Sequence, residues 1–321
     1  MKERLDYIDR ARGILIILMV IGHIWQSGFV FDTIYAFHMP AFFVISGFLL
    51  HITQSYKNPF QSFFLSRLFS FGIPLLFGEF LGIITDIMRN GVTLNIKGYV
   101  YTTISLTYNN KNIWFLLVLF CIEMMFAAAM RFLKKDRQMW LLGIVLYLSR
   151  YILPVGNGYM STLSDIFKYY IFFLMGYYGY TLFLKRKNAA VCVCTVILLI
   201  YVAFNQEIKP NNFLIQNLVY IFIASCGTYI TLWLSKCNFK EPINHFLEYS
   251  GQNSIVILCT HRIYYAALGL MLGVKDFKVT PIGKGILILV TVFLLEIPTI
   301  YVINRWLPFL AGKRKKKTKT A

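Results

Sequence analysis

The stretch RGILIILMVIGH, residues 12–23, decides how this chain can fold. Only apolar residues and glycine separate Arg12 from His23, as in a helix that enters a membrane. Eleven steps of about 100° return to the same face of an α-helix within roughly 20°. Arg12 and His23 should therefore share one face, roughly 16 Å apart along the helix axis. This arrangement predicts a polar path into the membrane with a titratable base at its end.

The composition around that stretch is typical of an all-α polytopic membrane protein. Of the 321 residues, 58% are hydrophobic and 14% are charged, whereas soluble domains carry about 25% charged residues. We expect one membrane domain over residues 1–310 and a short basic tail over residues 311–321. About ten apolar segments are long enough, or nearly so, to be transmembrane helices: 11–30, 34–53, 68–88, 113–133, 139–154, 165–184, 189–205, 213–234, 252–272 and 283–305.

The positions of the basic residues predict how these helices are oriented. Cytoplasmic loops carry an excess of Lys and Arg, and most of the 32 basic residues fall inside if both termini are cytoplasmic. The loop over residues 25–34 contains no Lys or Arg and is then outside. The net charge of +18 is mostly this topology signal, and the tail is expected on anionic lipid headgroups. We expect no nucleic-acid partner and no cleaved signal peptide.

Three histidines are predicted to lie inside the membrane, where ionisable side chains are costly and need a reason. His23 and His38 flank a predicted turn near residue 30, and a symmetric hairpin would place them at similar depth in the outer half. His261 lies near mid-membrane and raises the prospect of a shared polar cavity. The alternative for His23 and His38 is two separate core histidines bonded to backbone carbonyls.

Charged residues gather near the predicted cytoplasmic ends of the helices. Asp9 precedes Arg12 by three residues, so the two can pair on one face. Arg67 begins the third helix and could form, with Arg4, Arg10 and Arg12, a basic mouth for an anionic ligand. The alternative is that these arginines are positive-inside signals, which would suffice alone.

Other polar residues lie deeper in the predicted helices. Glu79 is a candidate site residue or a structural one. Glu123 and Glu296 are expected to be structural, either paired with a buried base or protonated and hydrogen-bonded. Ser46 and Gly47 are small residues suited to close helix packing, and no motif supports Ser46 as a nucleophile.

Several of these residues fall in motifs that resemble the acyltransferase family 3 membrane proteins. The resemblance rests on Arg12-Gly13 followed by His23, which is the family's R-x10-H pattern, on FHMPAFFVISGFLL at 37–50, and on Arg67 before the third helix. Weaker similarities occur at 113–120, 169–178 and 254–261. The sequence looks most like the fucose 4-O-acetylase-related and capsular polysaccharide O-acetyltransferase branch.

The resemblance implies a multi-pass protein of the bacterial cytoplasmic membrane with ten core helices. It implies transfer of an acyl group, usually acetyl, from cytoplasmic acyl-coenzyme A to a hydroxyl of a surface or exported glycan or a lipid-linked sugar. Arg12 and His23 match the family's essential pair, and His38 and Arg67 match further motif positions. Many members carry an added extracytoplasmic hydrolase-like domain. We expect none here, so transfer would finish in the membrane domain or with a separate extracytoplasmic partner.

The residues themselves agree with acyl transfer. His23 could act as a general base on a sugar hydroxyl or briefly carry the acyl group. Arg12 is too far from His23 along the helix axis to stabilise an oxyanion there. Its expected role is to bind the acyl-coenzyme A donor. His38 is then the better oxyanion candidate. We expect neither a metal nor a bound cofactor, with acetyl-coenzyme A as co-substrate.

Two other functional classes remain open. A proton-coupled transporter or flippase of a glycan-related substrate fits ten helices and buried histidines, although no inverted repeat is apparent. A non-catalytic membrane sensor or assembly partner fits less well, because Arg12, His23 and His38 occur together. The segment 89–112 is rich in Tyr, Thr and Asn, and could bind sugars or be an ordinary loop. The acceptor, the acyl chain and the oligomeric state do not follow from the sequence.

Overall fold

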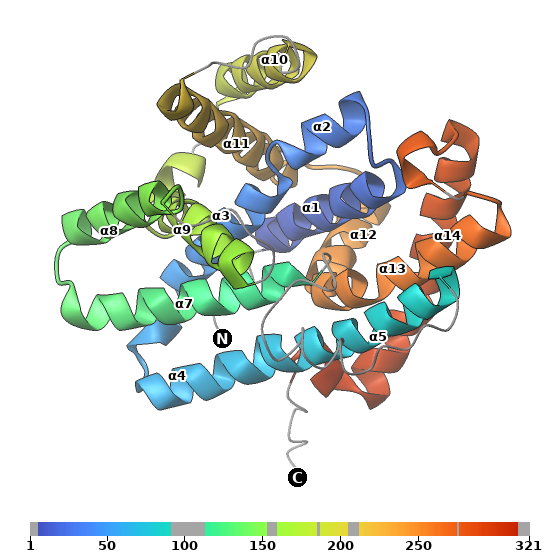
Figure 1. Cartoon of the computed structure of the whole chain (residues 1–321), viewed down its shortest axis with the longest axis horizontal. Helices are drawn as coiled ribbons and strands as arrows, with labels where there is room; N and C mark the ends of the chain where they lie inside the picture. The colour runs from blue at the N-terminus through green and yellow to red at the C-terminus, as the bar shows by residue number, and fades with distance from the viewer. Residues whose placement is uncertain are drawn as a thin grey trace. The chain divides into compact units, whose positions relative to one another are not determined.

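The computed structural model describes residues 6–90, 113–152, 159–184, 187–204, 212–274 and 276–313, and these residues form helices but no strand. Figure 1 shows their course, coloured from blue to red along the chain. The α-helices are α1 (Asp6–Ile24), α2 (Phe29–Tyr35), α3 (His38–Thr53), α4 (Phe60–Arg67), α5 (Ile73–Asn90), α7 (Trp114–Phe132), α8 (Asp136–Ser149), α9 (Tyr159–Leu184), α10 (Asn188–Phe204), α11 (Phe213–Ser235), α12 (Glu241–Gln252), α13 (Ser254–Met271) and α14 (Ile282–Trp306). The shorter helical segments are η1 (Ser55–Lys57), η2 (Leu68–Gly72), η3 (Phe277–Val279) and η4 (Pro308–Ala311).

The predicted all-α class is confirmed, and each of the ten predicted apolar segments overlaps one of the α-helices. Among the described residues, six helices are long and apolar enough to cross a membrane. They span Phe29–Thr53, Phe60–Arg89, Trp114–Phe132, Leu214–Ser235, Ser254–Met271 and Ile282–Trp306. The chain is therefore a membrane protein by its helices, while the count of ten spans and the cytoplasmic termini stay predictions. The candidate sugar-binding segment from residue 91 to 112 and the tail beyond residue 313 lie outside the described residues.

Three helices were not predicted from the sequence: α2, α4 and α12. Helix α4 extends the third predicted segment back to Phe60, so Arg67 ends α4 and does not begin the third helix as predicted. Helix α2 occupies most of the loop expected between the first two apolar segments, and α1 ends at Ile24 rather than near residue 30. The non-helical turn is therefore at residues 25–28, where Gly28 adopts a φ of 84°. Because α2 adds seven residues on one side only, the symmetric hairpin used to place His23 and His38 at equal depth is wrong.

The chain divides into two compact units, and the first comprises Met1–Thr53, Phe172–Ser254 and Val274–Leu289. Here α12, the last of the three unpredicted helices, packs along α1 (Figure 1). Glycines make this contact close, because a Cβ on Gly13 would overlap the carbonyl oxygen of Leu247, and one on Gly251 would overlap the carbonyl oxygen of Asp9. The two backbones therefore touch directly along this seam.

The same unit contains a second glycine contact, between α3 and α9. A Cβ on Gly47 would overlap the carbonyl oxygen of Phe173, and a Cβ on Gly176 would overlap that of Val44. This reciprocal pair confirms that Gly47 serves close helix packing, as its small size predicted.

The second unit comprises Gln54–Ile171, Ile255–Gly273 and Val290–Ala321. In it, α4 and α5 form one long rod, joined by a single π-helical turn at η2 (Figure 1). Pro74 explains the widened turn, because proline has no N–H for the carbonyl of Ser70 and its ring crowds that carbonyl. Gly312, in the left-handed region at φ 66°, lies against this carbonyl, where a Cβ would overlap it.

Candidate functional site

Arg12 lies in the second turn of α1 and is held by two side chains of the first unit. Its Nη2 donates a 2.8 Å hydrogen bond to the hydroxyl of Ser254, the first residue of α13. Its Nη1 lies 3.9 Å from a carboxylate oxygen of Asp9, which confirms the predicted i, i+3 pair. The Arg12 side chain remains 25% exposed. Both terminal nitrogens of the guanidinium therefore have a neighbouring side chain, while a quarter of the side-chain surface stays accessible.

His23 lies in the last turn of the same uninterrupted helix. Its helical spacing from Arg12 therefore allows both side chains to lie on one face, as predicted. It is half-buried, and its backbone carbonyl accepts a 3.0 Å hydrogen bond from the Gln26 side chain. The ring of Tyr35 lies over neighbouring Gly22, since a Cβ at that glycine would meet the ring at 2.8 Å. A larger residue at position 22 would displace that ring.

His38 begins α3 and is buried, with 2% of its surface exposed. Its Nδ1 lies 2.8 Å from the carbonyl oxygen of Ile34. A carbonyl can only accept, so Nδ1 carries the proton and Nε2 of the neutral ring holds the lone pair. The ring also packs edge-on against Tyr35, with centroids 4.6 Å apart. Tyr35 therefore contacts both His38 and the helix turn beside His23, a role that no sequence motif indicated.

This tautomer changes the expected role of His38. An oxyanion needs a donor, and the only N–H of neutral His38 already binds Ile34. Donation from Nε2 would require an additional proton and thus a buried charge, which is costly unless paired. The oxyanion role expected for His38 is therefore disfavoured by its geometry, whereas a proton-accepting role through Nε2 fits it.

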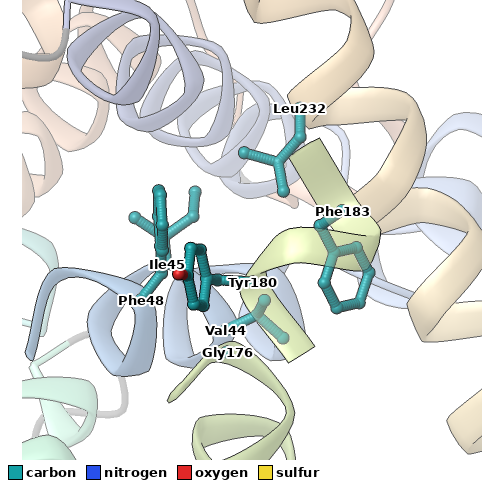
Figure 2. A pocket seen from close by; sticks show the side chains of 7 residues that line it. All are labelled: Val44, Ile45, Phe48, Gly176, Tyr180, Phe183 and Leu232. Atoms are coloured by element: carbon teal, nitrogen blue, oxygen red, sulfur yellow. The ribbon is translucent and has the colours of Figure 1, made fainter. Parts of the chain in front are cut away.

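Ser46 donates its hydroxyl to the carbonyl of Phe42 at 2.8 Å, one turn back in α3. That bond is the usual way a helix accommodates serine, and it agrees with a packing role. On the same helix, an apolar hollow opens between α3, α9 and α11, as Figure 2 shows. Its volume of about 10 Å³ is no more than one water needs, so it cannot hold a substrate. It is lined by Val44, Ile45, Phe48, Gly176, Tyr180, Phe183 and Leu232.

Arg67 lies at the end of α4 in the second unit and is paired with Glu123 of α7. Its Nε is 2.5 Å from Oε2 of Glu123, and its Nη2 donates a 2.9 Å hydrogen bond to Ser55. Phe63 and Phe71 lie beside the guanidinium, at 5.0 and 6.0 Å from their ring centroids. The expectation that Glu123 pairs with a buried base is confirmed. Donor binding by Arg67 stays a prediction, and so does the basic mouth, because Arg12 and Arg67 belong to different units.

Glu79 belongs to a second polar group in this unit, between α5 and α13. Glu79 is half-buried. It lies on the same face of α5 as Asp86, which follows seven residues later. Arg262 of α13 donates to Asp86 at 3.0 Å and attracts the Glu79 carboxylate. His261, next in sequence, is fully buried with its Nδ1 2.8 Å from the carbonyl of Ile257. His38 makes the same bond to Ile34, so both histidines show the arrangement of a core histidine bonded to a backbone carbonyl. The shared cavity with the other histidines stays a prediction.

Glu296 of α14 is also structural, as expected. Its two carboxylate oxygens lie 2.7 and 2.8 Å from the hydroxyl of Thr260, in a site where Glu296 is 1% exposed. Among the described residues, no cluster of three His, Cys, Asp or Glu side chains could hold a metal ion.

Sequence reasoning missed the partners that hold these residues. Ser254, Tyr35 and Arg262 contact candidate residues. Ser254 begins the weak similarity at 254–261, but nothing local in the sequence selects any of the three as a partner. Helix α12 left a weak signal, with Glu241 and Pro242 in its first turn, where both favour a helix start.

Comparison with known proteins identifies the family. A family model described as an acyltransferase domain, that of acyltransferase family 3, matches residues 5–301. No curated protein and no solved structure gives a significant match. The matched region covers nearly the whole chain and includes Arg12, His23, His38 and Arg67. This chain is therefore a member of the acyltransferase family 3 membrane proteins.

Proposed function

We propose that this membrane acyltransferase takes an acyl group, most simply acetyl, from acyl-coenzyme A and esterifies a hydroxyl of a cell-surface or exported glycan. The observation that carries the proposal is α1, one unbroken helix with Arg12 near its start and His23 in its last turn. Arg12 is held in place yet partly exposed, as an anion-binding group should be. The resemblance of the sequence to the fucose 4-O-acetylase-related and capsular polysaccharide O-acetyltransferase branch supports a glycan acceptor.

In this proposal Arg12 binds the donor. Its planar guanidinium offers paired N–H groups that suit a phosphate oxygen, and one described hydrogen bond leaves most of them available. Asp9 moderates the charge without forming a short contact, since the closest atoms are 3.9 Å apart. Arg67, Glu79, Ser46 and His261 remain proposed substrate-binding residues with structural contacts of their own.

His23 then acts as the base. It removes the proton of the acceptor hydroxyl while the oxygen attacks the thioester carbonyl and forms a tetrahedral intermediate. When the carbon–sulfur bond breaks, the imidazolium returns the proton to the coenzyme A thiolate. The products are the ester and free coenzyme A, so the reaction equation is balanced without an oxidant, a reductant or a metal. His38 could serve as a second proton acceptor through its Nε2.

Reconstitution tests this proposal. Purified protein in nanodiscs is given radiolabelled acetyl-coenzyme A, with and without a capsule-type oligosaccharide. We expect label in ester form on the sugar, detected by mass spectrometry, and loss of about 10²–10⁴-fold in His23→Ala. No label transfer and no donor hydrolysis, together with uptake of sugar into vesicles, would favour the transporter instead. A His23→Ala rate within about tenfold of wild type would remove the general-base role.

A further inference from the structure

Helix α12 and the start of α13 hold α1 at the turn that carries Arg12. Gly251 of α12 lies against the carbonyl of Asp9 and the backbone nitrogen of Gly13. One turn earlier, Glu248 approaches Arg10, with the closest charged atoms 3.8 Å apart. The residues on either side of Arg12 are therefore in backbone contact with α12. Any movement of α12 would move the base of the Arg12 side chain.

Ser254 extends this contact to the guanidinium itself. It is 5% exposed, and its hydroxyl accepts the 2.8 Å hydrogen bond from Nη2 of Arg12. Among the described residues, this is the only hydrogen bond that the Arg12 side chain makes, because the 3.9 Å approach of Asp9 is too long to be one. The position of Ser254 is itself set by Asn253, whose side-chain NH₂ donates to the carbonyl of Tyr249 at 2.8 Å and closes the end of α12.

We infer that Ser254 is a positioning residue, which orients Arg12 for the anionic donor; this inference rests on the proposed function. An arginine side chain has several rotatable bonds, and fixing it before the ligand arrives reduces the ordering cost of binding. The hydrogen bond to Ser254 fixes one edge of the guanidinium fork. N–H groups that make no hydrogen bond among the described residues are left to the ligand, and the side chain is 25% exposed.

Ser254→Ala removes the hydroxyl and leaves the backbone unchanged. We expect the affinity for free coenzyme A, measured by isothermal titration in nanodiscs, to fall about threefold to tenfold, the range for loss of one ordinary hydrogen bond. KM for acetyl-coenzyme A should rise by the same factor, with kcat within about twofold of wild type. Ser254→Thr keeps a hydroxyl and should restore the affinity to within about twofold.

Ser235→Ala is the matched control. Ser235 is also a fully buried helical serine, but its hydroxyl donates to the carbonyl of Leu232 and not to Arg12. It should bind coenzyme A like wild type. In an Arg12→Ala background, Ser254→Ala should cause no further loss, because its effect passes through Arg12.

The outcomes distinguish failure of the proposed acyl donor from failure of the inference about Ser254. If wild type binds no coenzyme A, the proposed donor is wrong. If wild type binds and Ser254→Ala binds equally well, the inference about Ser254 is overturned while the function stands. It is also overturned if Ser235→Ala loses as much affinity, or if the loss persists without Arg12.

Discussion

The ion pair between Arg67 and Glu123 makes the sharpest prediction about stability. The Glu123 side chain is 5% exposed and that of Arg67 is 21% exposed, so the pair lies mostly out of contact with solvent. Removing one partner of a buried pair costs about 3–5 kcal/mol, because the other charge is left without compensation. For Glu123→Leu we expect the lower end, about 3 kcal/mol, because Arg67 keeps its bond to Ser55.

Arg67→Met should cost a similar amount, because the carboxylate of Glu123 then lies buried and must take up a proton. The double variant Arg67→Met/Glu123→Leu removes both charges and should lie within about 1 kcal/mol of wild type. Thermal unfolding in detergent gives the measurement. A loss of about 3 kcal/mol corresponds to a decrease of roughly 4–6 °C in the unfolding midpoint. Single variants that cost under about 1 kcal/mol, or a double variant equal to the sum of both, would refute this reasoning.

The same double variant decides whether Arg67 also binds the donor. Its stability should be restored, so any remaining defect reports chemistry rather than folding. We expect KM for acetyl-coenzyme A to stay about tenfold above wild type, the loss expected for one charged contact. A KM within about threefold of wild type would limit Arg67 to its structural pair with Glu123.

Three further predictions test other parts of the molecule. His38→Asn keeps an N–H near the carbonyl of Ile34, so the variant should fold with a wild-type unfolding midpoint but lose about 10²-fold or more in acyl transfer; wild-type rates would make His38 structural only. Gly176→Ala should lose about 1–3 kcal/mol against the Val44 carbonyl, whereas Gly283→Ala, in open space, should be neutral or slightly stabilising; equal midpoints would contradict this. In a background without native cysteines, Ser27→Cys should react with an impermeant maleimide from outside the cell; reaction only after permeabilisation would reverse the predicted orientation.

The elements that sequence predicted best are those with a local signal. Long apolar segments identified the helices, because burial in lipid requires a continuous apolar stretch. The Asp9–Arg12 pair followed from helical spacing, and the close packing at Gly47 followed from its size. Each of these predictions uses a sequence signal that lies within a single segment of the chain.

The missed elements depend on contacts between distant residues. Arg67 and Glu123 are 56 positions apart, and nothing in either segment selects the other. Helix α12 is too short and too polar to read as a span, and only packing on α1 shows its importance. Sequence could therefore propose the candidate residues, but not the side chains that hold them.

The contact between α1 and α12 can form only late in synthesis. Arg12 and its partner Ser254 are separated by 242 residues. A ribosome adds about 5–20 residues per second, so α1 leaves the ribosome roughly 10–50 s before Ser254 does. Throughout that interval the glycine face of α1 has no α12 to pack against, and Arg12 lacks its hydrogen-bond acceptor. A nascent chain stopped before residue 241 would present this face to other membrane helices, and to any insertion chaperone that recognises an unpacked one.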